Sequence, residues 1–146
     1  MIFFIIGQPG AGKTTVGREL QRRIGGVQID GDELRGIFHD TDYSRFGREK
    51  NIQRAMDIAL YQRSIYETVI VSMVCPYNNI REKFDTQADV FWVYLISDED
   101  RGKDKYKVGY FEKLTGVKQD IEISTDGTIT PVGVVDLILH HIKFCK

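Results

Sequence analysis

Short apolar runs alternate along the chain with segments whose apolar residues recur every three or four positions. An uninterrupted apolar run predicts a strand buried on both faces, and helical spacing predicts an amphipathic helix. The expected strands cover residues 2–6, 27–30, 68–73, 90–96 and 121–124. The expected helices cover residues 13–24, 32–38, 47–66 and 76–84, and a last one starts at residue 131. This alternation favours an α/β fold with about five mainly parallel strands and helices on both faces.

Three of the expected helices have a local start signal. Asp32 precedes "ELRGIF" and is expected to be the N-cap of the helix at 32–38, because a carboxylate there can accept from free N–H groups. Pro76 and Pro131 are each expected to open a helix.

Length and composition narrow the class of protein. The 146 residues contain no repeat or linker, so we expect a single domain over residues 1–146. The net charge of −1 argues against long nucleic acid or an acidic membrane as a partner. The longest apolar runs are too short to cross a bilayer, and the start of the chain lacks the pattern of a signal peptide. Two cysteines do not make a disulfide framework, so we expect a cytoplasmic protein.

The segment "GQPGAGKTT" directly follows the first expected strand and matches G-x-x-x-x-G-K-[ST], a phosphate loop. Its glycines let successive N–H groups point at phosphate oxygens, and the following helix adds its positive N-terminal end. The lysine can reach the β- and γ-phosphates, and the next hydroxyl can bind the accompanying Mg²⁺. The expected nucleotide-binding residues are Gly7, Gln8, Pro9, Gly10, Ala11, Gly12, Lys13, Thr14 and Thr15, with Thr14 as the metal ligand.

Other phosphate-loop classes fit less well than a small kinase. The Asn-Lys-x-Asp motif with which GTPases read guanine is missing, and "VIVS" ends in Ser72 where a motor ATPase usually has a carboxylate. The carboxylates instead follow the second expected strand, in "DGDELR". Asp30 and Asp32 could bind magnesium-associated water or take the acceptor's proton, and Arg35 could hold an anionic acceptor. Alternatively, Asp32 only caps its helix and pairs with Arg35 in solvent.

A further motif, "DYSRFGREKNIQRA", spans residues 42–55. Arg48 and Asn51 are three residues apart and therefore share a helix face, and Tyr43 could stack on a planar ring. Together with the phosphate loop, "DGDELR" and "SMVCPYNNIR", this motif resembles the pattern of the adenylylsulfate kinase family in order and spacing. The corresponding residues outside the loop are Asp30, Gly31, Asp32, Arg35, Tyr43, Ser44, Arg48, Asn51, Ile52, Arg54, Ser72, Pro76, Tyr77, Arg81, Thr115 and Gly116.

The resemblance implies the three-layer sandwich of a P-loop kinase. It also implies sulfate assimilation chemistry, in which phosphate passes from MgATP to the 3′-hydroxyl of adenosine 5′-phosphosulfate, with Lys13 and Asp32 catalytic and Asp32 as the base. By the same resemblance, the acceptor would contact Asp30, Asp32, Arg35, Tyr43, Arg48, Asn51 and Leu114, and Arg101 and Lys105 would act in a lid at about 98–116. That charged segment could equally be a solvated surface loop. The family resemblance also allows a homodimer.

Three positions depart from the family pattern. Cys75 replaces a serine, Gly47 replaces an aspartate, and Leu114 replaces a second aromatic residue over the acceptor's adenine. Because stacking on a base contributes about 1–3 kcal/mol, the change at Leu114 leaves the acceptor open. The main alternative is a kinase of the same build that uses a sugar, a nucleoside or a polynucleotide 5′-end. The other is a nucleotide-binding regulator without transfer activity, but such a protein would need no second anion site.

Overall fold

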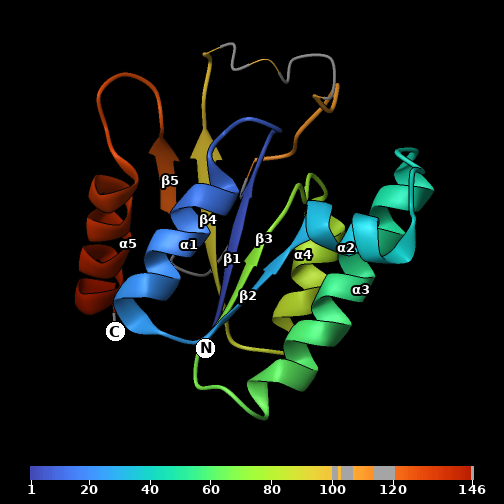
Figure 1. The fold of residues 1–146 in the computed structure, drawn as a ribbon, viewed down its shortest axis with the longest axis horizontal. Helices are drawn as coiled ribbons and strands as arrows, with labels where there is room; N and C mark the ends of the chain where they lie inside the picture. The colour runs from blue at the N-terminus through green and yellow to red at the C-terminus, as the bar shows by residue number, and fades with distance from the viewer. Residues whose placement is uncertain (100–101, 103–106, 114–120, 146) are drawn as a thin grey trace.

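Five parallel strands form one sheet at the centre of the folded molecule (Figure 1). The computed structural model describes residues 1–99, 102, 107–113 and 121–145. Its strands are β1 (Ile2–Gly7), β2 (Val27–Asp30), β3 (Val69–Ser72), β4 (Val90–Ile96) and β5 (Ile121–Ser124), in the order β2-β3-β1-β4-β5. The predicted α/β class and the five strands are confirmed.

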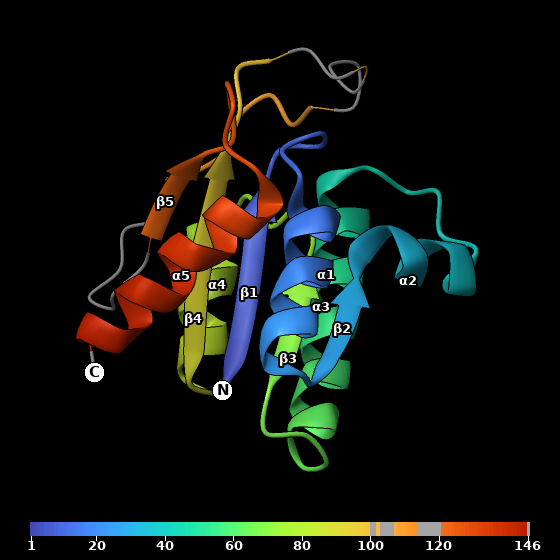
Figure 2. The same cartoon turned by 60° about the vertical axis from the view of Figure 1, so that its left-hand side comes forward.

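Helices cover both faces of this sheet (Figure 2). They are α1 (Lys13–Ile24), α2 (Gly31–Phe38), α3 (Arg45–Arg63), α4 (Asn78–Asp85) and α5 (Pro131–Cys145). Helices α1 and α5 pack on one face, while α2, α3 and α4 pack on the other. The predicted three-layer arrangement is therefore confirmed. No helix among the described residues has the length and apolarity to cross a membrane.

Strand β1 is buried on both faces because its side chains alternate between two cores. Phe4 joins the core under α3 and α4, whereas Phe3 and Ile5 join the core under α1 and α5. Trp92 of β4, the single tryptophan, stacks on Phe4 with ring centroids 4.7 Å apart. Its indole N–H donates to a carboxylate oxygen of Asp85 at 2.9 Å, so the polar edge of the ring is satisfied inside the core.

Two helix starts differ from the predictions. Helix α3 begins at Arg45 rather than residue 47, because the Ser44 hydroxyl accepts from the N–H of Gly47 and makes Ser44 the N-cap. Helix α4 begins at Asn78, after an extended Tyr77, rather than at Pro76. The Pro76 carbonyl instead accepts from the N–H of Glu112, which keeps it out of the helix.

The predicted N-cap of α2 is wrong. Asp30, the last residue of β2, is the cap: its side chain accepts from the N–H of Asp32 at 2.8 Å and from that of Glu33 at 3.3 Å. Strand β2 runs into α2 without a loop, so the last strand residue must satisfy the free N–H groups of the first helical turn. Asp32 lies inside that turn, and its carboxylate is left for another use.

The sheet brings the functional segments to one edge. Because all strands are parallel, β1, β2 and β3 end side by side, with Asp30 paired to Ser72 and Ser72 paired to Ile5. The neighbouring strands β1 and β3 are followed by helices on opposite faces, α1 and α4. This is the point of an open parallel sheet at which a ligand crevice is expected.

Candidate active site

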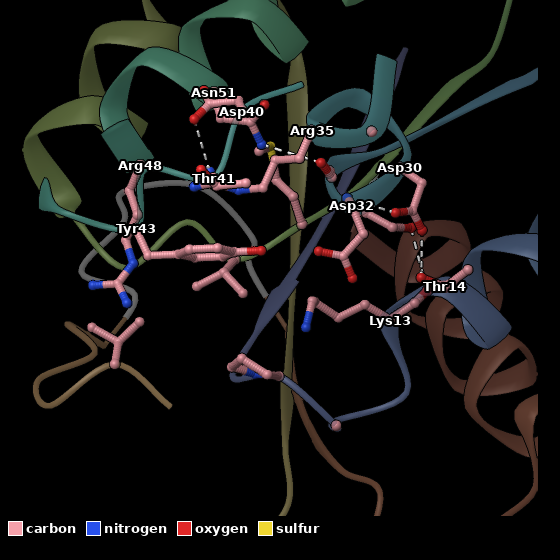
Figure 3. Close-up of a pocket in the computed structure, with 18 of the residues that line it drawn as sticks. Lys13, Thr14, Asp30, Asp32, Arg35, Asp40, Thr41, Tyr43, Arg48 and Asn51 are labelled. Atoms are coloured by element: carbon pink, nitrogen blue, oxygen red, sulfur yellow. Dashed lines mark hydrogen bonds and ion pairs between the residues drawn. The ribbon is translucent and has the colours of Figure 1, made fainter. Parts of the chain in front are cut away.

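A cavity of about 920 Å³ opens at this edge (Figure 3). Its wall runs from the phosphate loop across the start of α2 and the 39–43 connection to α3. Residues 72–74 and Val108 complete it. Segments that are far apart in the sequence therefore share one cavity large enough for more than one small molecule.

The phosphate loop has the backbone that its glycines predict. Gly10 and Gly12 have φ values of 86° and 95°, a left-handed conformation that other residues rarely adopt. Gly12 is the N-cap of α1 and has no side chain to satisfy the first N–H groups of the helix. These groups, with the positive end of the helix dipole, are suited to an anion.

Lys13 lies at the start of α1 and points into the cavity (Figure 3). Its ammonium group donates to the main-chain oxygen of Gln8 at 2.8 Å. Burial lowers the pKa of Lys13 from 10.5 to about 8, against the opposing effect of the Asp32 and Asp30 carboxylates. A phosphate would add negative charge here and favour the protonated lysine.

Thr14 and Asp30 form a pair of oxygen donors beside the loop. The Thr14 hydroxyl donates to Oδ2 of Asp30 at 2.5 Å, although 16 residues separate them. Hydroxyl and carboxylate oxygens are ligands that Mg²⁺ prefers, so this pair fits the expected ion. Ser72 acts structurally: its hydroxyl donates to the Lys13 carbonyl and accepts from Gln28.

The Asp32 carboxylate faces the cavity beside Lys13 (Figure 3). Within the part of the chain that the structure describes, no hydrogen bond to this carboxylate is present, since Asp30 takes over the capping of α2. Asp32 is therefore placed to accept a proton from a bound hydroxyl.

Arg35 does not pair with Asp32 in solvent, so that alternative is wrong. It is buried, its guanidinium donates to the Asp42 carbonyl at 2.9 Å, and it lies 3.4 Å from a carboxylate oxygen of Asp40. It also covers one face of the Tyr43 ring at 4.1 Å from the centroid. The N–H of Asp42 and the Arg54 guanidinium hold the pKa of Asp40 below its usual value, so this carboxylate stays charged beside Arg35.

Tyr43, Arg48 and Asn51 line the part of the cavity away from the phosphate loop (Figure 3). The hydroxyl end of Tyr43 points toward Asp32. Asn51 is almost fully buried, and its amide N–H donates to the Gly31 carbonyl at 3.2 Å. Its side-chain oxygen accepts no hydrogen bond from the described residues. A buried acceptor on a cavity wall is suited to a ligand donor.

The structure shows the surroundings of two residues that depart from the family pattern. Any Cβ at Gly47 would collide with the Asp42 main-chain oxygen and side chain, so glycine lets the turn before α3 pack against the helix. Cys75 is completely buried, and burial raises the pKa of its thiol to about 12. A neutral thiol of this kind is a poor nucleophile.

Several cavity residues were missed by the sequence analysis. His39, Thr41, Met73, Val74 and Val108 line the wall, as does Asp40. The polar run "HDTDYS" between two helices is a signal that could have pointed to the first two and to Asp40. The predicted site residues Leu114, Arg101 and Lys105 lie outside the described residues, together with much of the expected lid.

Known proteins resemble this chain in sequence and in fold. The family model for adenylylsulphate kinase matches residues 1–129. An adenylyl-sulfate kinase from Buchnera aphidicola is 25% identical over 84% of this chain and 66% of its own length. A cytidine diphosphoramidate kinase from Campylobacter jejuni is also 25% identical, over 86% of this chain and 77% of its own. The chain thus spans about two thirds of the first relative.

A solved structure gives the same fold. The APS kinase of Mycobacterium tuberculosis in complex with AMPPNP and APS superposes with a TM-score of 0.79 at 17% identity, covering 97% of this chain and 96% of that one. The family and its kinase relatives support an ATP-dependent phosphotransferase. Since the family model matches most of the sequence, this chain belongs to the adenylylsulphate kinase family.

Proposed function

We propose that this protein transfers the γ-phosphate of MgATP to the 3′-hydroxyl of adenosine 5′-phosphosulfate. One observation carries the proposal: a single cavity joins Lys13 and Thr14 at one end with Arg48 and Asn51 at the other, and the Asp32 carboxylate lies between them (Figure 3). Donor and acceptor can bind in this cavity together, with a candidate base between them.

At the donor end, the protein's task is to hold phosphates. The N–H groups at the start of α1 bind phosphate oxygens, and Lys13 moves from the Gln8 carbonyl to the β- and γ-phosphates. Thr14 and Asp30 would hold the ion, with Thr14 turning its hydroxyl away from Asp30. When bound, Mg²⁺ neutralises negative charge on the transferred group.

At the acceptor end, Arg48 supplies positive charge for an anionic group and Asn51 supplies an oxygen for a ligand donor. Arg35 covers one face of the Tyr43 ring, so a base would stack on the opposite face. Asp32 accepts the proton as the acceptor's hydroxyl attacks the γ-phosphate. Transfer is direct, since the nearby thiol of Cys75 is buried and protonated.

A pyrimidine nucleotide is the second candidate acceptor. The cytidine diphosphoramidate kinase relative is as similar to this chain as the adenylyl-sulfate kinase relative. Arg35 is also tied to the carboxylate of Asp40 and the carbonyl of Asp42, which reduces what it can offer to a sulfate. The first observation favours a cytidine compound as acceptor, and the second favours an acceptor whose anionic group depends mainly on Arg48.

A transfer assay with γ-labelled ATP tests the proposal. Its acceptors are adenosine 5′-phosphosulfate, cytidine diphosphoramidate, gluconate and a 5′-hydroxyl oligonucleotide. We expect the highest kcat/KM with adenosine 5′-phosphosulfate. A tenfold preference for the cytidine compound would move the assignment to the second candidate. Binding of ATP with no transfer to any acceptor would favour a regulator.

The Leu114→Phe variant sharpens this assay. If adenine binds between Tyr43 and residue 114, phenylalanine should improve binding by about 0.5–1.5 kcal/mol, a few-fold lower KM. A higher KM for adenosine 5′-phosphosulfate, with unchanged ATP parameters, would contradict an adenine site there.

The cytoplasmic location of the protein and its assembly as a homodimer stay predictions.

A further inference from the structure

One side chain of the phosphate loop binds both main-chain groups of a residue 100 positions away. The Gln8 amide N–H donates to the Val108 carbonyl at 2.9 Å, and the Gln8 amide oxygen accepts from the Val108 N–H at 2.8 Å. This bidentate contact, the Gln8–Val108 bridge, satisfies the backbone of a buried residue that belongs to no helix or strand.

Val108 contributes to the wall of the active-site cavity. The other described residues that line the cavity all lie between Pro9 and Val74. The placement of this piece of wall therefore depends on what holds residue 108. The bridge is a direct tie between this wall and the loop expected to hold the nucleotide.

The rest of the 107–113 segment has a separate anchor. The N–H of Glu112 donates to the Pro76 carbonyl at 3.0 Å, and its carboxylate accepts from the N–H of Asn78 at 3.1 Å. The ring of Phe111 stacks on Tyr94 at 4.9 Å, with 7° between the planes. Removing the bridge should therefore free Val108 while the end of the segment stays in place.

We propose that Gln8 is a positioning residue that fixes Val108 to the phosphate loop, so that nucleotide binding also sets the cavity wall for the acceptor. The loop is held more firmly once phosphates occupy it, and Gln8 passes that restraint to Val108. The coupling to the nucleotide rests on the proposed function, whereas the bridge itself does not. Lys13 contacts the main-chain oxygen of Gln8, so side-chain variants leave that contact intact.

Amide hydrogen exchange of the full chain, followed by NMR, tests the bridge. In Gln8→Met, exchange at Val108 should become about tenfold faster, as expected for loss of one net hydrogen bond of roughly 1.4 kcal/mol. Exchange at Glu112 should not change. Gln8→Glu should partly restore protection, because its carboxylate can still accept from the Val108 N–H. Gln21→Met removes a glutamine whose side-chain amide donates to the nearby Gly26 carbonyl, away from the cavity, and should have no effect.

The coupling is tested with a non-hydrolysable ATP analogue and with kinetics. The analogue should slow exchange at Val108 in the wild type but not in Gln8→Met. The variant's apparent KM should rise about tenfold for the acceptor and much less for ATP, the result of about 1.4 kcal/mol lost at the cavity wall.

Unchanged exchange at Val108 in Gln8→Met would overturn the proposal. Equal acceleration at Val108 and Glu112 would also overturn it, because it would indicate general loosening. If the analogue protected Gly10–Thr15 but left wild-type Val108 unaffected, the coupling would be wrong. Absence of protection in the loop itself would instead count against the proposed function, and the exchange comparison between variants would still decide the bridge.

Discussion

The donor and acceptor ends of the cavity are built in different ways. The donor end comes almost entirely from one contiguous stretch, Gly7–Thr15, between β1 and the first turn of α1. The acceptor end is assembled from α2, the 39–44 connection and α3, and Arg35, Asp40 and Arg54 there are already paired with one another. A contiguous loop carries its geometry in local backbone preferences, whereas an assembled site depends on packing between separate elements.

The largest expected effect is at the donor end. Lys13→Ala should lower kcat/KM by about 100-fold or more, because it removes the positive charge that stabilises the transferred phosphate. Steady-state kinetics measure this, with Lys83→Ala on α4 as a control, since Lys83 does not line the cavity. Wild-type turnover in Lys13→Ala would refute the phosphate-loop assignment.

At the acceptor end, Arg48→Ala should raise the acceptor's apparent KM by about 10- to 150-fold, the equivalent of the 1.5–3 kcal/mol of a charge-assisted contact. The KM for ATP should change little. Lys50→Ala, two positions along the same helix and outside the cavity wall, is the matched control. If Arg48→Ala disturbed ATP alone, the two ends would have been assigned the wrong way round.

The pH dependence should separate the ends further. Lys13 must be protonated to meet phosphates, and its pKa in the nucleotide-free protein is about 8. Because kcat/KM for ATP reports the free enzyme, it should fall by up to about tenfold per pH unit above this value.

Lys13→Arg, which stays charged, should remove the fall. A fall that persisted in this variant would have to come from another titrating group.

The lowered pKa of Lys13 also affects stability. Between about pH 8 and its ordinary pKa of 10.5, the folded chain binds fewer protons than the unfolded chain. Lys13 therefore makes the free energy of unfolding rise with pH in this range.

The smallest expected effect is at Cys75, which does not line the donor end or the acceptor end of the cavity. Cys75→Ala should keep kcat within about twofold of wild type, because a buried neutral thiol is inert. Mass spectrometry after incubation with MgATP alone should find no phosphate on Cys75. A phosphocysteine that forms and decays as fast as turnover would contradict direct transfer.

The contrast between the ends also explains what the sequence could predict. The fold class, the strands and the loop follow from local patterns, and the structure confirms them. Arg48 and Asn51 were correctly placed on one helix face because helical spacing is a local property. The prediction that Asp32 is the N-cap of α2 was wrong, because the sequence does not reveal that β2 joins α2 without a loop.

Pairings between separate elements were beyond local reasoning. Arg35 pairs with the Asp40 carboxylate and the Asp42 carbonyl. Both partners lie on a turn that can pack against α3 only because Gly47 has no Cβ. The partner of the Gln8 side chain is 100 residues away. No periodicity or motif encodes such contacts, because they exist only once the sheet has set the register of its strands.

The single tryptophan gives the protein a selective optical signal. Trp92 is enclosed between Phe4 and Phe84 in the core under α4 and does not line the cavity. Its emission should therefore report water reaching the sheet and α4, and shift to longer wavelength as that layer opens. Titration with nucleotide should leave the emission nearly unchanged, so melting curves read at this ring measure the scaffold independently of the site.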